Sequence, residues 1–234
     1  LKFYVVYQNR LNKSVLYLKN NFEKLFNEKI AFVNLKLLWC REQKYYSDWH
    51  GSWKMDGGVI AQQGIHYIDL LCHFFGKPIK CISLMSNISN KLQAEDTNIG
   101  IIQFNSVVCT INLTTSLRPK DQEASIEIFS KTKTVKLHGL CCNKLDILNN
   151  KKNSKKFKYL SKKQSTDVPT GYGLSHRVVI KDVVDSFNGK KNAKPLNAIS
   201  TIETLKLVHM LYRSFDKKKW IFNKDENYNS KLGN

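Results

Sequence analysis

The sequence has little of what marks secreted or membrane-spanning proteins. Even its apolar runs Ile99 to Phe104 and Val107 to Leu113 are too short and too interrupted by polar residues to cross a bilayer. Its six cysteines show no C-x-x-C spacing, and several lie in apolar runs, which favours buried, reduced thiols. The start at Leu1 has no initiator Met, basic n-region or small-residue cleavage site. We therefore expect a cytoplasmic protein with no membrane span.

Acidic residues are also scarce, with 19 Asp and Glu against 38 Lys and Arg, so the formal net charge is +19. The 42% of hydrophobic residues nevertheless predicts a globular chain with a full core. The excess is mostly lysine, and it accompanies many Asn, Ile, Phe and Tyr residues, a set that a compositional bias of the genome can produce. In the densest stretch, Lys151 to Lys163, apolar residues alternate with lysines. We interpret it as a lysine-protected edge strand or hairpin rather than an RNA- or DNA-binding ribbon, so nucleic acid is not an expected partner.

The first residues predict a strand that has no neighbours of its own. Residues 2–7 (KFYVVY) form a continuous apolar run, typical of a fully buried parallel strand. Such a strand needs neighbours, so we expect an N-terminal portion to be missing.

The rest of the chain predicts an α+β fold with a mostly antiparallel, open sheet and helices on one face. Residues 42–56 read as a loop that holds aromatic side chains at a surface or cleft. Helices are expected at 12–26, 56–75, 174–187 and 199–215. Strands are expected at 30–41, 79–87, 97–104, 107–115, 123–129, 134–137 and 144–148.

The helix at 56–75 is apolar over most of its circumference, with Asp56 as its predicted N-cap. Its exceptions are Gln62, His66, Asp69 and His73, whose spacing of four, three and four residues places them on one narrow stripe. Three interpretations remain open. The stripe is the solvent face of an ordinary amphipathic helix, or three of its residues bind a metal, or His66 moves a proton on and off a sugar hydroxyl.

Residues 51–71 (GSWKMDGGVIAQQGIHYIDLL) resemble the signature of the Gfo/Idh/MocA oxidoreductases, in which glycines lead into a G-x-H-x-x-D helix. These residues are most similar to those of the branch of the family that oxidises the 3-hydroxyl of UDP-N-acetylglucosamine or of its glucuronic acid. Further matches are residues 8–12, 95–97, 117–121 with 123–126, and 171–176 with 182–184.

The resemblance implies a two-domain dehydrogenase, with an N-terminal Rossmann domain for NAD or NADP and a C-terminal α/β domain that binds substrate. On this basis, residues 1–12 are expected to be the last strand of a truncated dinucleotide-binding domain, and residues 13–234 the substrate-binding and oligomerisation domain. The chain contains neither a G-x-G-x-x-G fingerprint nor the family's Glu-Lys-Pro segment with its catalytic Lys. The fragment alone is therefore expected to be inactive, with the cofactor bound mainly by the missing domain. The implied partners are a nucleotide-sugar or polyol substrate and further copies of the chain, in a homodimer or homotetramer.

The resemblance assigns His66 as the acid/base group at the hydroxyl that is oxidised. Gln62 stands where relatives have Asp or Asn, and because an amide relays no proton it can only orient substrate or nicotinamide. Asp69 is expected to orient the neighbouring backbone or His66, and no metal is expected in the site. The remaining substrate-side candidates are Arg10, Asn12, Tyr46, Trp53, Lys54, Arg118 and His176.

A second hypothesis belongs to a different functional class. The chain would be a non-catalytic remnant of the family that binds partners through its open sheet and its lysine-rich surface. Salt-dependent retention on a nucleic-acid matrix, compared with protection by a UDP-sugar against thermal unfolding, separates the two hypotheses.

Overall fold

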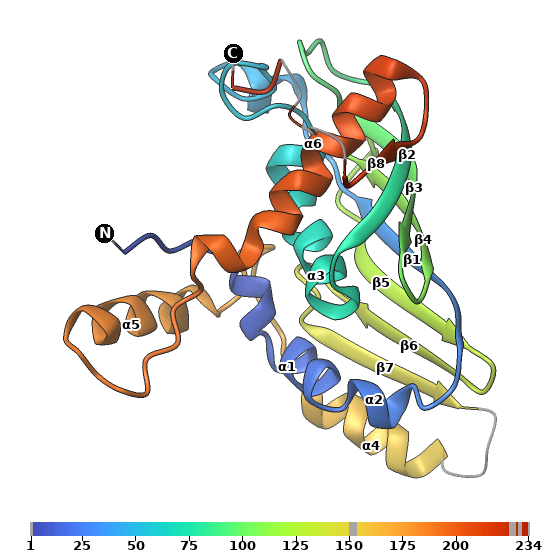
Figure 1. Ribbon diagram of the computed structural model, residues 1–234, viewed down its shortest axis with the longest axis vertical. Helices are drawn as coiled ribbons and strands as arrows, with labels where there is room; N and C mark the ends of the chain where they lie inside the picture. The colour runs from blue at the N-terminus through green and yellow to red at the C-terminus, as the bar shows by residue number, and fades with distance from the viewer. Residues whose placement is uncertain (1, 150–153, 225–227, 229–230, 234) are drawn as a thin grey trace.

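The computed structural model describes residues 2–149, 154–224, 228 and 231–233. Its centre is an eight-stranded sheet in the order β7-β6-β5-β1-β4-β3-β2-β8 (Figure 1). Only β1 and β4 pair in parallel, and every other neighbouring pair is antiparallel. The strands are β1 (Ile30–Leu38), β2 (Pro78–Ser86), β3 (Thr97–Phe104), β4 (Val108–Thr114), β5 (Glu123–Ser130), β6 (Lys133–His138), β7 (Lys144–Asn149) and β8 (Ile221–Phe222).

Most helices lie on one face of this sheet, with α3 over its middle, α6 packed on β2 near the β8 edge, and α1, α2 and α4 over the β7 end (Figure 1). The predicted α+β architecture with a mostly antiparallel sheet is therefore confirmed. The helices are α1 (Lys13–Asn20), α2 (Phe22–Leu25), α3 (Ile65–Phe75), α4 (Ser154–Gln164), α5 (His176–Phe187) and α6 (Ile202–Lys217). Short turns are η1 (Gln8–Leu11), η2 (Gln43–Tyr46), the π-helical η3 (Ile60–Gly64) and η4 (Ala198–Thr201).

The core lies between the sheet and these helices. Along β1, the alternating residues Val33, Leu35 and Leu37 are fully buried, in one cluster with Ile68 and Leu71 of α3. Each such side chain contributes roughly 1.5–3 kcal/mol through its removal from water. This burial fixes α3 against the sheet, and α3 is the element that carries His66.

The N-terminal segment is partly exposed in this structure, and its place as the last strand of a preceding domain stays a prediction. Only Tyr4 forms a bridge, with Asn197, while Phe3 is 69% and Val6 is 51% exposed. A parallel strand needs partner strands on both sides, and within the described residues only the backbone of residues 196–198 pairs with this segment.

The basic stretch at 151–163 was predicted as an edge strand or hairpin, and this prediction is wrong. Residues 154–164 form α4, which packs on β7, whereas residues 151–153 lie outside the described part. Phe157 and Leu160 are three residues apart and are partly buried, so they form a helical face toward the sheet. With this helical spacing the lysines face solvent, as they also would in an edge strand whose residues alternate.

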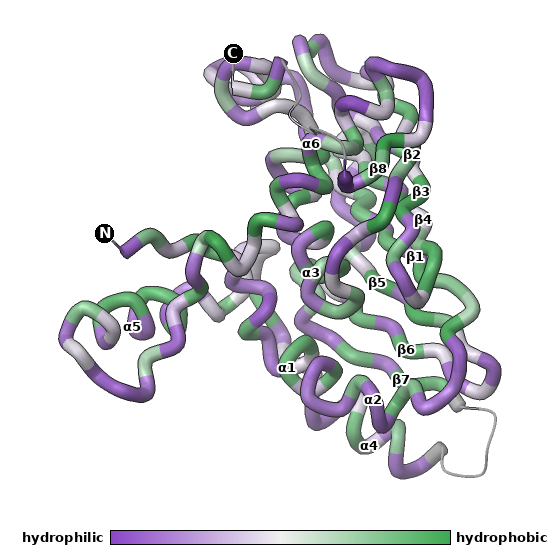
Figure 2. The backbone as a smooth tube through the Cα atoms, in the orientation of Figure 1, coloured by the Kyte–Doolittle hydropathy of each residue, from purple (hydrophilic) through white to green (hydrophobic). Residues whose placement is uncertain are grey.

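Two apolar surfaces remain uncovered. The helix α5 stands apart from the sheet, yet it is rich in hydrophobic residues (Figures 1 and 2). On the outer face of the sheet, Leu84 of β2 pairs with Ile99 of β3, and these side chains are 72% and 58% exposed. Among the described residues, no helix has the length and apolar character needed to cross a membrane.

Candidate functional site

The helix that carries the polar stripe begins with a wide turn. Residues 60–64 form a π-helix, which continues into α3 and ends at Gly76, where φ is +79°. Because a π-turn holds more residues than an α-turn, Gln62 and Gln63 both reach the same side of the helix. A strict 3.6-residue period predicts this position for Gln62 but not for its neighbour. Asp56 is not the N-cap, since it accepts a hydrogen bond from the Gly51 amide instead.

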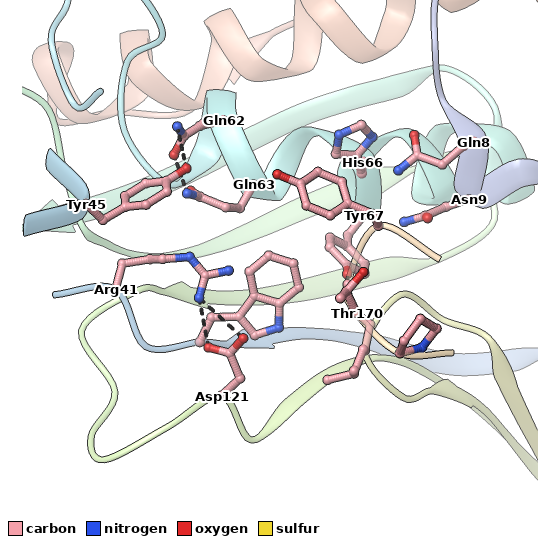
Figure 3. Close-up of a pocket in the computed structure, with 15 residues that line it drawn as sticks. Gln8, Asn9, Arg41, Tyr45, Gln62, Gln63, His66, Tyr67, Asp121 and Thr170 are labelled. Atoms are coloured by element: carbon pink, nitrogen blue, oxygen red, sulfur yellow. Dashed lines mark hydrogen bonds and ion pairs between the residues drawn. The ribbon is translucent and has the colours of Figure 1, made fainter. Parts of the chain in front are cut away.

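This side of the helix faces a cavity of about 560 Å³ (Figure 3). The walls come from η1, the end of β1, the loop of residues 42–56, the η3–α3 helix, the loop before β5 and the loop before α5. The lining residues are Gln8, Asn9, Trp39, Arg41, Tyr45, Gln62, Gln63, His66, Tyr67, Asp121, Leu140, Pro169, Thr170, Gly171 and Tyr172.

His66 lies in this cavity as a neutral imidazole. Burial lowers its pKa to about 4, and the nearby His176 lowers it further in the same direction. The buried Nδ1 atom has no hydrogen-bond partner among the described residues. The ring meets the edge of Tyr7, with centroids 6.0 Å apart. A neutral imidazole with an unpaired nitrogen can accept a proton from a bound ligand.

Side-chain amides surround His66. Gln8 and Asn9 are buried in η1 and point toward the His66 end of the cavity (Figure 3). From the helix, Gln62 Nε2 donates to the Tyr45 hydroxyl at 2.9 Å, and Gln63 donates to the Gln62 carbonyl oxygen. Amides both donate and accept hydrogen bonds, as sugar hydroxyls do. The inner wall therefore suits a ligand with several hydroxyl groups.

Arg41 is the single arginine or lysine among the lining residues, although the whole chain has 38 such residues. Its Nη1 donates to Asp121 Oδ1 at 2.9 Å, and its guanidinium lies 4.9 Å from the Trp39 ring centroid. Its Nε and Nη2 donate to no residue in the described part of the chain. This free edge has the geometry that pairs with a carboxylate or phosphate.

Arg10, a predicted substrate ligand, is instead paired with Asp69. Its Nε and Nη2 donate to the two carboxylate oxygens at 2.7 and 2.6 Å, and Asp69 is completely buried. Thr204 donates to the same carboxylate at 2.9 Å. Asp69 thus orients Arg10 and the η1 turn rather than His66.

Two further candidates are buried and already bonded within the protein. Asn12 donates to the Cys141 carbonyl at 2.6 Å and accepts from the Ser175 hydroxyl at 2.8 Å. The Tyr46 hydroxyl bonds to that of Thr115 at 2.7 Å. Neither side chain lines the cavity, so both hold loops around it.

The remaining candidates lie around or away from the cavity. Trp53 packs edge-on against Tyr212, with centroids 5.1 Å apart, and Lys54 is exposed. Arg118 is exposed and donates to three backbone carbonyls, at 2.9, 3.1 and 3.5 Å. His176 lies near enough to His66 to influence its charge but does not line the cavity.

Of the ten predicted residues, His66 and Gln62 line the cavity. Several that were missed lie in segments already singled out as motif matches, namely Gln8, Asn9 and Asp121. The motif matches pointed to these segments, but they did not predict which side chain of each segment faces the cavity. In the described ranges, no group of three His, Cys, Asp or Glu residues could hold a metal ion.

One family model matches most of the chain. The model of a family described as "oxidoreductase family, C-terminal alpha/beta domain" matches residues 28–222. No curated relative matches the chain.

Solved structures share the fold. The WlbA dehydrogenase from Bordetella pertussis, in complex with NADH and UDP-GlcNAcA, is 25% identical, with a TM-score of 0.80 over 94% of this chain and 64% of that chain. The WlbA enzyme from Chromobacterium violaceum, with the same ligands, is 23% identical, with a TM-score of 0.80 over 94% and 62%. A levoglucosan dehydrogenase with NADH and levoglucosan is 15% identical, with a TM-score of 0.70 over 95% and 66%. The chain thus spans less than two thirds of either WlbA chain.

Proposed function

The chain belongs to the Gfo/Idh/MocA family of oxidoreductases, and on that premise we propose that it is the substrate-binding domain of an NAD(P)-dependent dehydrogenase that oxidises a sugar hydroxyl. The observation that carries the proposal is the cavity itself. A neutral His66 lies there among the amides of Gln8, Asn9, Gln62 and Gln63. That arrangement combines a proton acceptor with groups that hold a polyol.

In the proposed reaction, His66 takes the proton of the hydroxyl that becomes a carbonyl. The amides around it hold the neighbouring hydroxyls, which fixes the reacting carbon relative to the imidazole. Gln62 cannot relay a proton, so its role is to orient the substrate. His66 is therefore the proton-handling group of this domain.

When bound, NAD or NADP would supply the hydride acceptor. The 234 residues contain no glycine-rich dinucleotide fingerprint, so we assign no residue of this chain to the diphosphate or adenosine of the cofactor. The chain's own contribution is to bind the sugar, orient it and accept its proton.

The proposed substrate is a UDP-N-acetylhexosamine or its uronate. Two observations support this choice. The first is the 25% identity to a WlbA dehydrogenase solved with UDP-GlcNAcA. The second is the free Nε and Nη2 edge of Arg41, since Arg41 and Asp121 are the charged residues of the cavity wall. An anionic substituent of the substrate would pair with that edge.

We further propose that the enzyme is a homo-oligomer joined through the outer face of the sheet. An antiparallel sheet with one solvated face normally presents polar side chains there. This face instead presents Leu84, Ile99, Ile101 and Phe32, each more than a third exposed. Contiguous apolar surface of this kind marks an interaction site, and a second copy of the same sheet matches it in chemistry.

The decisive experiment uses the complete gene product that contains this chain. NAD- and NADP-dependent oxidation of UDP-GlcNAc, UDP-GlcNAcA and levoglucosan is followed by reduced-cofactor absorbance. The proposal expects turnover with at least one nucleotide sugar, and faster turnover than with levoglucosan. Turnover of levoglucosan alone would refute the substrate, and no turnover of any sugar, together with salt-sensitive retention on a nucleic-acid matrix, would favour a non-catalytic binding module.

A further inference from the structure

The start of the η3–α3 helix is held from outside the helix by one carboxyl group and one phenol. The first amides of a helix have no acceptor within it and need one elsewhere. Here the Gly58 amide donates to the Tyr212 hydroxyl at 3.1 Å, the Val59 amide donates to the Glu95 carbonyl at 2.9 Å, and the Ile60 amide donates to Glu95 Oε1 at 2.9 Å. Three consecutive amides are thus satisfied by two residues, from the loop before β3 and from α6.

These two residues also hold each other. The Tyr212 hydroxyl donates to Glu95 Oε1 at 3.0 Å, so one oxygen accepts both from the phenol and from the Ile60 amide. Glu95 is 3% and Tyr212 is 1% exposed. The contact is also tightly packed, since a Cβ added at Gly58 would lie 2.2 Å from the Glu95 carbonyl oxygen and 2.3 Å from its carboxyl carbon. Neither the turn nor the carboxyl group can shift without the other.

We propose that Glu95, supported by Tyr212, is a positioning residue of the dehydrogenase proposed above, because it fixes the turn that aims Gln62 and Gln63 into the cavity. Only one residue separates Ile60, which Glu95 holds, from Gln62. His66 follows on the next turn of the same rigid helix. Glu95 touches no cavity atom itself, and its effect passes through the backbone of η3.

The carboxyl group acts in its neutral form. No cation pairs with it within the described part of the chain. Burial, with a smaller contribution from the adjacent Asp96, raises its pKa to about 8. The second oxygen, Oε2, is buried without a partner, and a proton on this oxygen avoids an uncompensated buried charge. A glutamine at this position would therefore reproduce both accepted hydrogen bonds.

The test compares Glu95→Gln and Glu95→Ala in the complete enzyme, with Glu23→Ala, at an exposed glutamate of α2 that does not line the cavity, as a matched control. We expect Glu95→Gln and the control to keep kcat and KM within about threefold. Glu95→Ala should lower kcat by about tenfold to 100-fold with a smaller rise in KM, since a displacement of ~1 Å costs about 100-fold. Two results would overturn the proposal. One is a loss of activity in Glu95→Ala that Glu95→Gln shares. The other is a folded Glu95→Ala protein whose activity stays within threefold of wild type.

Tyr212→Phe serves if Glu95→Ala does not fold, because it removes one hydroxyl and no packing volume. We expect a three- to tenfold fall in kcat, and a change below twofold would count against the proposal. Crystal structures of Glu95→Ala, or of Tyr212→Phe in its place, give a readout that needs no turnover. The proposal expects Gln62 and Gln63 to be displaced by ~1 Å, whereas their superposition within about 0.5 Å would refute it. If the wild-type enzyme oxidises no sugar, the proposed function fails, and these structures still decide whether Glu95 positions the turn.

Discussion

Replacing Asp69 with alanine should destabilise the protein by about 3–4 kcal/mol. The carboxylate is completely buried and accepts both nitrogens of Arg10, whose side chain is 14% exposed. Removal of one partner of a buried ion pair costs roughly 3–5 kcal/mol, because the remaining charge is left uncompensated. Because Arg10 is partly exposed, the cost of leaving its charge unpaired lies near the lower end of that range. The Thr204 hydroxyl also loses its acceptor, which costs about 1 kcal/mol.

The assay is urea unfolding followed by tryptophan fluorescence, in which the midpoint should fall while the m-value stays constant. As a control, Asp167→Ala breaks an exposed pair, with Lys144 at 3.0 Å, and should cost no more than about 1 kcal/mol. The double variant Arg10→Ala/Asp69→Ala should lose about 1–3 kcal/mol less than the sum of the single losses. A loss below about 1 kcal/mol for Asp69→Ala, or strict additivity, would contradict the buried ion pair.

Three further outcomes follow from the described geometry. Gly58→Ala should destabilise the protein by at least about 2 kcal/mol, or yield none that is folded, since the new Cβ would lie 2.2 Å from the Glu95 carbonyl oxygen; an unchanged melting temperature would refute that packing. Between about pH 6.5 and 4, His66 should contribute a loss of about 3 kcal/mol of stability, because its folded pKa of about 4 means that the unfolded chain binds the proton first. Burial lowers the pKa of His73 to about 4 as well, so His66→Ala should reduce the slope of the stability profile without abolishing it; an unaltered slope would argue against the shifted pKa of His66. Leu84→Glu with Ile99→Glu should convert the proposed homo-oligomer to monomer in light scattering, because the double change places charge on the exposed apolar face, and an unchanged mass would contradict assembly through this face.

Most of the sheet could be predicted from the sequence because its strands alternate between buried and exposed residues. The strand predicted at 30–41 is an example: its apolar residues Val33, Leu35 and Leu37 alternate with polar ones, which is local information, and all three are buried. The parallel pairing of β1 with β4 could not be predicted, since it joins residues about 76 positions apart and no local pattern encodes it. The stretch at 154–164 was misassigned because its apolar residues fit both a period of two and a helical spacing.

The candidate site divides in the same way. His66 and Gln62 could be found from helical spacing and from the motif. Gln63 was missed because the π-turn changes the period of the helix at that position. Arg10 and Asn12 were recognised as polar residues next to the site, but their partners Asp69 and Cys141 are 59 and 129 residues away. Which polar residue satisfies another in the fold, and which is left free for a ligand, is decided by tertiary contacts.

The role proposed for His66 is to accept the proton of the hydroxyl that is oxidised, and a comparison of three enzymes tests it directly. The complete enzyme is assayed for NAD(P)-dependent oxidation of its best nucleotide sugar as wild type, as His66→Ala and as His138→Ala, a histidine of β6 that does not line the cavity. We expect His66→Ala to lower kcat at least about 100-fold, the size of a lost general base, and His138→Ala to stay near the wild-type value. A His66→Ala enzyme that folds and turns over within about threefold of wild type would contradict it.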